Sequence, residues 1–220
     1  MKVEDIKQVA VVGAGMMGAQ LAQRFSQVGK YPITITDIKD EFINKGLQFI
    51  QGGLKKYFVD KGKMTQGEMD EIVGRIKGTT NLAEAVKNAD FVLEAVFENL
   101  DVKKNIFKQL DENAPADTIL ASNTSNLNIS EMASVTKRAD KVVGMHFFNP
   151  VAIMKLVEVV RSPLTSDETV DTTVALARKL NKEPVVCKDF SFGFLANRAY
   201  GPMFVEAIQM VWERVASPED

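Results

Sequence analysis

The sequence predicts an α/β protein built on a doubly wound, mostly parallel sheet. Short apolar or β-branched runs alternate with amphipathic helical stretches along most of the chain, a pattern typical of a parallel sheet with helices on both faces. The first run, residues 8–12, leads into a glycine turn at residues 13–18 and then into a helical pattern. The next run closes on Asp37. This order of strand, glycine turn, helix and acidic strand end is that of a Rossmann-type dinucleotide-binding unit.

The remaining elements follow from the hydrophobic pattern. Strands are expected where apolar residues alternate or cluster, and helices where they recur with helical spacing. The expected strands cover residues 8–12, 33–37, 91–95, 118–122, 141–147, 156–160 and 184–187. The expected helices cover residues 19–28, 102–110 and 166–180, with a further amphipathic run from 193 to 213.

Residues 40–77 depart from the minimal strand–helix–strand unit. Two charged amphipathic stretches, 42–59 and 66–76, flank the polar segment 61–65. We expect a helical hairpin inserted after the second strand. It is either a solvated crossover that covers the sheet or a wall for a long substrate.

Two domains are expected, a nucleotide-binding domain at residues 1–188 and the start of a helical C-terminal domain at residues 189–220. The last amphipathic run ends shortly before Pro218 and two acidic residues, which often open another helix. We therefore expect this chain to contain only the first helix of an all-α C-terminal domain. Several apolar side chains would then lack cover, which favours self-association: Phe194, Met203, Phe204, Ile208 and Trp212.

Composition and charge exclude several classes of protein. The chain has 220 residues, 45% of them hydrophobic, with 27 basic against 29 acidic side chains. This content supports a globular core, and the charge balance leaves no basic stripe for nucleic acid. No stretch approaches the length of a membrane span, and the first strand begins too close to Met1 to leave room for a signal peptide. We therefore expect a cytoplasmic protein that binds neither nucleic acid nor membranes.

The glycine turn predicts how a dinucleotide is bound. Gly13 permits the tight turn, Gly15 lets the backbone approach the pyrophosphate, and Gly18 allows the helix to pack closely on the strand. Met16 and Met17 complete the turn at the amino end of the helix, where backbone amides favour negative phosphates.

Asp37 predicts which dinucleotide is bound. Its carboxylate is expected to accept hydrogen bonds from the adenosine ribose diol and to repel the extra phosphate of NADP. NAD is therefore the expected cofactor. Lys30 and Lys39 lie near enough in sequence to serve as counter-charges, so NADP remains the alternative.

One imidazole must carry any acid–base chemistry near neutral pH, because His146 is the only histidine. Glu158 follows within the apolar strand 156–160, where a carboxylate is costly to bury without a partner. In such a pair, the carboxylate orients the ring while the other ring nitrogen faces the substrate. The alternative is a structural ion pair around a core histidine. Cys187 is the only cysteine. Without a second cysteine or histidine it cannot anchor a zinc site, so no metal is expected.

With these motifs the chain resembles the L-3-hydroxyacyl-CoA dehydrogenases of fatty-acid β-oxidation and their short-chain 3-hydroxybutyryl-CoA relatives. The likeness runs along essentially the whole chain. It departs at Phe190-Ser191-Phe192, where the family has a shorter, proline-containing link. The segments that carry the resemblance are residues 13–18 (GAGMMG), 94–100 (EAVFENL), 121–125 (ASNTS), 144–150 (GMHFFNP), 155–160 (KLVEVV) and 193–198 (GFLANR).

The resemblance implies the reversible, NAD-dependent oxidation of (S)-3-hydroxyacyl-CoA to 3-oxoacyl-CoA, with an acyl-CoA as substrate. It implies that His146 and Glu158 form the catalytic dyad and that Ser125 contacts both the substrate hydroxyl and the cofactor. Asn197 is implied to complete the polar cluster around the reacting carbon. These assignments agree with the chemistry, since alcohol oxidation needs a base for the hydroxyl proton and donors for the developing oxyanion.

The resemblance also extends to the cofactor pocket and to assembly. Glu98 and Lys103 match positions that line the nicotinamide side, and Asn149 matches a position that supports the same pocket. The family's C-terminal helical domain closes the cleft and makes a homodimer, which is the expected assembly of the full-length protein.

Two alternatives stay open at this point. One is a non-catalytic dinucleotide-binding protein, as the lens crystallins of this broader family are. Such a protein has no use for a paired buried charge, so His146 and Glu158 favour an enzyme. The other is a dehydrogenase of a free hydroxy acid.

Overall fold

The computed structural model describes residues 1–190 and 192–220. Ser191, in the link that departs from the family, lies outside the described residues. The described chain forms an eight-stranded sheet in the order β3-β2-β1-β4-β5-β6-β7-β8, in which β6 and β7 pair antiparallel and the other neighbours pair parallel. The strands are β1 (Val9–Val12), β2 (Ile33–Thr36), β3 (Ile76–Thr79), β4 (Phe91–Glu94), β5 (Ile119–Ser122), β6 (Val142–Phe147), β7 (Leu156–Arg161) and β8 (Glu183–Lys188).

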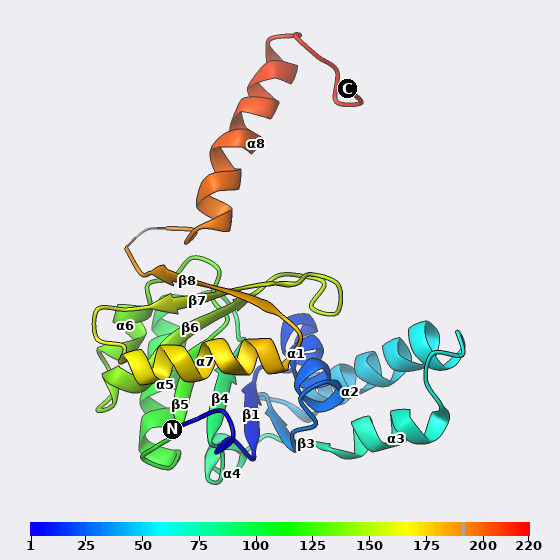
Figure 1. Cartoon of the computed structure of the whole chain (residues 1–220), viewed down its shortest axis with the longest axis vertical. Coiled ribbons are helices and arrows are strands. Elements are labelled where there is room, and N and C mark those ends of the chain that lie inside the picture. The colour runs from blue at the N-terminus through cyan, green and yellow to red at the C-terminus, as the bar shows by residue number, and fades with distance from the viewer. Residues whose placement is uncertain (191) are drawn as a thin grey trace.

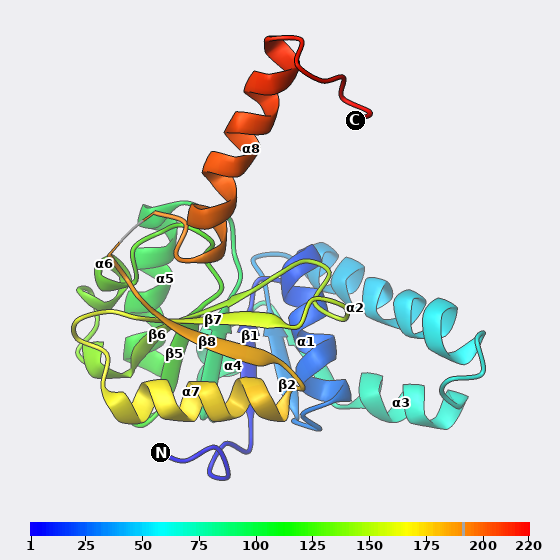
Figure 2. The same cartoon turned by 45° about the horizontal axis from the view of Figure 1, so that its top comes forward.

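Helices cover both faces of this sheet (Figures 1 and 2). Alternate residues of β1 enter two separate cores, with Val9 and Val11 in one and Ala10 and Val12 in the other, because side chains alternate across a strand. The doubly wound, mostly parallel sheet predicted from the sequence is confirmed. The helices are α1 (Met16–Gln27), α2 (Asp40–Leu54), η1 (Lys55–Val59), α3 (Gln66–Gly74), α4 (Leu82–Val86), α5 (Leu100–Asn113), α6 (Ile129–Ala133), η2 (Ala139–Lys141), α7 (Asp167–Lys179) and α8 (Ala196–Trp212).

The hairpin region contains a strand that the sequence analysis missed. The helix predicted to run to residue 76 ends at Gly74, and β3 follows as an edge strand parallel to β2. β3 has four residues, of which only Ile76 is buried, so its hydrophobic pattern is too short to reveal a strand. The helix predicted over 42–59 begins at Asp40 and changes to a π-helical turn at Lys55.

The segment from α2 to α3 connects two parallel strands, β2 and β3, and extends from one end of the sheet (Figures 1 and 2). α2 buries Ile43, Gly46, Ile50 and Leu54. The segment is therefore a crossover that covers the sheet edge. A hollow that it shares with α1 leaves a role as a substrate wall open.

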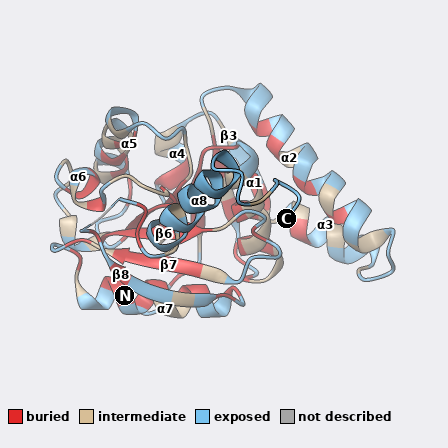
Figure 3. Ribbon diagram, turned by 90° about the horizontal axis from the view of Figure 1, so that it is seen from above, coloured by how far each residue is buried: buried red, intermediate tan, exposed pale blue. Residues whose placement is uncertain are grey.

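α8 projects away from the sheet, and none of its residues is buried (Figures 1 and 3). It follows the 189–195 link after β8. Its first turn nevertheless touches the body of the protein, because the backbone amides of Leu195 and Ala196 donate to Glu158 on β7. The base of α8 is thus tied to the strand that carries the predicted catalytic carboxylate.

Candidate active site

The glycine turn after β1 lies where a dinucleotide-binding fold needs it. Gly13 has φ +105°, a left-handed conformation that side chains disfavour. A Cβ on Gly18 would collide with the backbone of Gly13, whereas a Cβ on Gly15 would meet nothing within 4 Å. The turn therefore packs tightly at Gly18 and stays open at Gly15.

The amino end of α1 suits an anion. Gly15 is the N-cap and offers no side-chain cap, and the first turn of the helix carries no acidic residue. Its backbone amides therefore have no competing side-chain acceptor. The turn faces a hollow of about 660 Å³ whose lining includes Gly13, Gly15, Met16 and Asp37. These features fit the pyrophosphate of a dinucleotide.

Asp37 follows β2 and lies beside the same turn. Its Oδ2 accepts a hydrogen bond from the amide of Ala14 at 2.7 Å, and its Oδ1 accepts one from the amide of Ile38 at 2.7 Å. Each carboxylate oxygen can accept more than one hydrogen bond. The carboxylate is therefore fixed against the glycine turn and keeps capacity for a ribose diol.

His146 and Glu158 face each other across the antiparallel pair of strands, β6 and β7. Directly opposite side chains in such a pair share one face of the sheet and lie within contact distance. His146 Nδ1 lies 2.7 Å from Glu158 Oε2, and both residues are buried. The pairing predicted from the sequence is confirmed by this hydrogen bond. With Nδ1 donating to the carboxylate, Nε2 of the neutral ring is left as an acceptor.

Glu158 receives two further hydrogen bonds. Its Oε1 accepts from the amides of Leu195 at 2.9 Å and Ala196 at 2.8 Å, at the start of α8. Burial acts to raise the pKa of Glu158, but the hydrogen bonds from His146, Ala196 and Leu195 outweigh it and lower the pKa below its ordinary value. The buried carboxylate is therefore ionised at neutral pH.

Aromatic rings surround the imidazole. The ring of His146 lies 4.5 Å from that of Phe148 and 5.8 Å from that of Phe194, measured between centroids. The expectation that Phe194 lacks cover is wrong, because its side chain is buried in a hydrophobic core. The residue between His146 and Phe148 is tied down as well, because the amide of Phe147 donates to Asn123 Oδ1 at 2.9 Å. The histidine is thus held between apolar walls at the end of β6.

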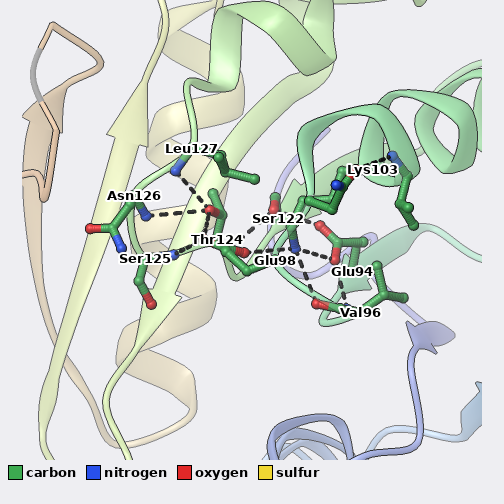
Figure 4. Close-up of polar contacts among 11 residues, drawn as sticks. Glu94, Val96, Glu98, Lys103, Ser122, Thr124, Ser125, Asn126 and Leu127 are labelled. Carbon is green, nitrogen blue, oxygen red and sulfur yellow. Dashed lines mark hydrogen bonds and ion pairs between the residues drawn. The ribbon is translucent and has the colours of Figure 1, made fainter.

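Ser125 lies in the turn after β5, in a polar network with the segment after β4 (Figure 4). Its amide donates to Glu98 Oε1 at 3.1 Å. Glu98, in turn, lies 3.2 Å from the ammonium group of Lys103. Burial acts to raise the pKa of Glu98, and bonds from Thr124, Lys103 and Ser125 outweigh it and lower the pKa. Glu98, Lys103 and Ser125 border one hollow of about 230 Å³, together with Met17 of the glycine turn.

The structure gives Lys103 an unexpected position for a ligand-binding lysine. The residue is only 1% exposed. Its ammonium group contacts Glu94 Oε1 at 2.6 Å, Glu98 Oε2 at 3.2 Å and the carbonyl of Val96 at 3.3 Å. These three contacts match the three N–H donors of an ammonium group, so each donor has a partner within the protein. The cofactor role predicted for Lys103 stays a prediction.

The two asparagines occupy different places. Asn149 is exposed, and its Oδ1 accepts from Gln20 Nε2 of α1 at 2.9 Å. Gln20 Oε1 accepts from the amide of Val151, so this glutamine joins the loop after β6 to the helix that follows the glycine turn. Asn197 is exposed on the first turn of α8, one residue after an amide that donates to Glu158. Its role as a substrate donor stays a prediction.

Three side chains that hold segments around the candidate site were missed by the sequence analysis, namely Gln20, Glu94 and Asn123. Glu94 carried a usable signal, because a carboxylate closing an apolar strand is the same feature that marked Glu158. Gln20 and Asn123 act through backbone amides of distant segments. No local pattern reveals such contacts.

Two negative findings concern the described residues alone. Within residues 1–190 and 192–220, no three His, Cys, Asp or Glu side chains cluster in a way that could hold a metal ion. In the same part of the chain, no helix is long and apolar enough to cross a bilayer.

The crevice beside the glycine turn and the buried histidine–carboxylate pair lie at the same end of the sheet. β1, β4, β5 and β6 run parallel, so their carboxyl ends meet at one edge, where the strand order reverses. Together they define an NAD-dependent oxidoreductase.

Comparisons with known proteins narrow this class. The family described as 3-hydroxyacyl-CoA dehydrogenase, NAD binding domain, matches residues 8–190. The chain is 46% identical over 215 residues to a probable 3-hydroxybutyryl-CoA dehydrogenase of Bacillus subtilis, covering 98% of this chain and 74% of that protein. It is 40% identical to the human mitochondrial hydroxyacyl-coenzyme A dehydrogenase, covering 98% and 69%.

Solved structures agree with these relatives. The (S)-3-hydroxybutyryl-CoA dehydrogenase PaaH1 from Ralstonia eutropha superposes with a TM-score of 0.92 at 41% identity, covering 98% of this chain and 75% of that one. The M. tuberculosis protein FadB2 superposes with a TM-score of 0.92 at 37% identity and the same coverage. The chain therefore belongs to the 3-hydroxyacyl-CoA dehydrogenase family.

Proposed function

We propose that the protein catalyses the reversible, NAD-dependent oxidation of (S)-3-hydroxyacyl-CoA to 3-oxoacyl-CoA in fatty-acid metabolism. The observation that carries the proposal is the buried pair of His146 and Glu158, joined at 2.7 Å. Membership of the family supports an enzyme rather than the non-catalytic alternative.

His146 acts as the base in the oxidative direction. Its Nε2 takes the hydroxyl proton of the substrate, because Nδ1 is engaged with Glu158. The carboxylate stabilises the imidazolium that forms and keeps the ring in one orientation. In the reductive direction, the imidazolium returns the proton to the ketone oxygen. NAD, when bound, supplies the nicotinamide that accepts a hydride from the carbinol carbon.

Ser125 and Asn197 are proposed as donors to the substrate oxygen. Neither side chain has a hydrogen-bond partner of its own among the described residues, so both keep their donors for a ligand. Donors aimed at a developing oxyanion lower the barrier more than the same donors do in water. Ser125 also lies beside Glu98, which supports its contact with the cofactor.

A second hollow supports a long, phosphate-bearing substrate. It has a volume of about 580 Å³ and lies between α1, the α2–η1 segment and the loop after β6. Arg24, Lys61 and Lys63 line it together with Phe49 and Tyr57. Cations recognise phosphates and aromatic rings stack on a nucleobase, which is the chemistry that the ADP end of coenzyme A requires.

The test is NADH oxidation with acetoacetyl-CoA as substrate, alongside NADH binding followed by fluorescence. We expect wild-type turnover, and a loss of about 100- to 10,000-fold in His146→Gln, the range for removing a general acid–base group, with NADH affinity retained. Loss of turnover and binding together would make His146 structural. A wild-type protein that binds NADH and oxidises it only with free acetoacetate would be a dehydrogenase of a free hydroxy acid.

Homodimeric assembly and a cytoplasmic location complete the proposal. The uncovered apolar face of α8 supports self-association. The location rests on the sequence alone and is tested by fractionation of cells that express the protein.

A further inference from the structure

Glu94 is a buried carboxylate that the proposed mechanism does not use. It is the last residue of β4 and is 0% exposed. Its neighbours in register are Val12 of β1 and Ser122 of β5, so it lies at the carboxyl ends of the central strands, under the cofactor crevice. A carboxylate buried there is costly unless its partners hold it firmly.

One oxygen of Glu94 reaches the turn that carries Ser125. Oε2 accepts from Ser122 Oγ at 2.6 Å, and the same Oγ accepts from the amide of Thr124 at 3.1 Å. Two hydrogen bonds therefore connect the carboxylate to the backbone of the turn (Figure 4).

The other oxygen reaches the same turn by a second route. Oε1 contacts Lys103 Nζ at 2.6 Å, and the ammonium group also contacts Glu98 Oε2 at 3.2 Å. Glu98 Oε1 accepts from Thr124 Oγ1 and from the amide of Ser125. The two routes close a ring in which Glu94 is the fully buried anchor, whereas the side chain of Glu98 is 39% exposed.

We propose that Glu94 is a positioning residue whose carboxylate, through Lys103 and Ser122, fixes Glu98 and Ser125 in the cofactor crevice. The charge matters as well as the shape. Lys103 lies between two carboxylates, and a neutral residue at position 94 would leave it with Glu98 as its one charged partner. The ammonium group would then draw Glu98 away from Thr124 and Ser125. The effect on turnover rests on the proposed function, whereas the effect on NADH binding does not.

The test is a pair of double-mutant cycles. We expect Glu94→Gln to weaken NADH binding and to lower kcat, each by about tenfold. In the Glu98→Gln background its effect on NADH affinity should shrink below about twofold, and in the Ser125→Ala background its effect on kcat should do the same, because residues that act through one another are not additive. Full, additive effects in both backgrounds would overturn the proposal.

Asp111→Asn is the matched control. Asp111 lies on α5, the helix that carries Lys103, and forms a mostly buried ion pair with Arg138 at 2.8 Å, outside the ring around Glu94. We expect this variant to lower the melting temperature while NADH affinity and kcat stay within twofold of wild type. Losses of binding and kcat as large as those of Glu94→Gln would show general destabilisation and overturn the proposal.

Ser122→Ala provides the test if Glu94→Gln does not fold, because it removes only one of the two routes. Its loss of kcat should be several-fold and should vanish in the Ser125→Ala background; an additive loss overturns the proposal. The binding cycle needs no turnover. A coupled effect on NADH affinity in a protein that does not reduce acetoacetyl-CoA would support the role of Glu94 and reject the proposed substrate. Reduction of acetoacetyl-CoA without a coupled effect would support the proposed substrate and reject the role of Glu94.

Discussion

At the scale of the residue, the contacts of the Glu158 carboxylate set the surroundings of the His146 ring. Three donors surround the carboxylate, one from the imidazole and two from the first amides of α8. They lower its pKa although burial acts in the opposite direction. A charge held in this way can stabilise an imidazolium without itself taking up the proton.

Glu158→Gln is predicted to keep the hydrogen bond to the ring and to lose the negative charge. The imidazolium then loses its counter-charge, so kcat should fall by about 10- to 100-fold, up to the lower end of the range of general acid–base effects. Because the imidazolium is the proton donor in reduction, the alkaline limb of the kcat/KM profile should move to lower pH. The measurement is the pH dependence of acetoacetyl-CoA reduction. An unchanged profile would remove Glu158 from its assigned role.

The same variant has a signature in stability. Because folding lowers the pKa of Glu158, its contribution to the free energy of unfolding is complete above the ordinary value of 4.5 and is lost as pH falls through the lowered value. The difference between wild type and Glu158→Gln in urea unfolding should be constant near neutral pH and shrink in acid. A difference that grows on acidification would contradict this linkage.

Cys187 is predicted to be unreactive in the folded protein. Burial, with Glu158 and Asp189 nearby, raises its pKa from 9.0 to about 12, and each unit is a factor of ten in thiolate. The native thiol should therefore react with a disulfide reagent about 1000-fold more slowly than an ordinary thiol of pKa 9. The control is the denatured chain, whose one cysteine should react at the rate of an ordinary thiol and release one equivalent of the reagent's thiol. Rapid labelling of native protein would show that the thiol is accessible.

At this scale, the sequence predicts a buried charged residue only where that residue stands alone in an apolar segment. Glu158 was identifiable because a lone carboxylate in an apolar strand needs a partner, and the chain offered one histidine. Lys103 sits on α5 among other charged residues, so nothing in its local pattern shows that it is only 1% exposed. Its burial depends on Glu94, which belongs to another element.

At the scale of the element, regular strands and helices with several buried residues were predictable from their spacing. β3 was not, because one buried side chain in four gives no periodicity. α4 and α6 were missed for a related reason. Each has five residues and is started by an asparagine cap, Asn81 or Asn128, and a cap followed by so short a helix reads as a loop.

The η1 segment and the residues after it are predicted to select the substrate's ADP end. Exchanging Lys61 and Lys63 for glutamate should raise KM for acetoacetyl-CoA about three- to tenfold, the scale of exposed charge contacts, and leave NADH affinity unchanged. KM for acetoacetyl-pantetheine, which lacks the ADP portion, should not change.

The matched control exchanges two exposed lysines on the other face of the sheet, Lys87 and Lys108, for glutamate. This pair changes the net charge by the same amount without touching the hollow lined by α1 and η1. Equal effects of both pairs would mean that net charge, rather than a binding site, governs KM.

At the scale of the whole molecule, the parallel sheet assembles the site. The glycine turn, Glu98 and Ser125 follow β1, β4 and β5 respectively, and His146 lies near the end of β6. Parallel strands bring those ends to one edge. Motifs that are scattered along the chain become neighbours for this reason, and this is why the location of the site followed from the sequence. The antiparallel return of β7 then adds the carboxylate from the opposite direction.

α8 leaves the molecule with an uncovered apolar stripe. Tyr200, Phe204, Ile208 and Trp212 recur at helical spacing and are each more than half exposed. Burying Phe or Ile is worth about 1.5–3 kcal/mol per side chain, so pairing two such helices repays the cost of association. The protein is predicted to be a dimer at micromolar concentration, measured by light scattering.

Phe204→Glu combined with Ile208→Lys should weaken the dimer on the order of 100-fold or more, since each lost burial changes the dissociation constant by tenfold or more. Glu206→Lys, elsewhere on α8, should leave the mass measured by light scattering at that of the dimer. Because the amides at the start of α8 hold Glu158, the monomeric variant should also lose turnover. NADH affinity, which depends on the segments around β1, β2, β4 and β5, should be kept. A wild-type chain that stays monomeric at all concentrations would contradict the predicted dimer. A dissociated variant with full turnover would show that turnover does not depend on the dimer.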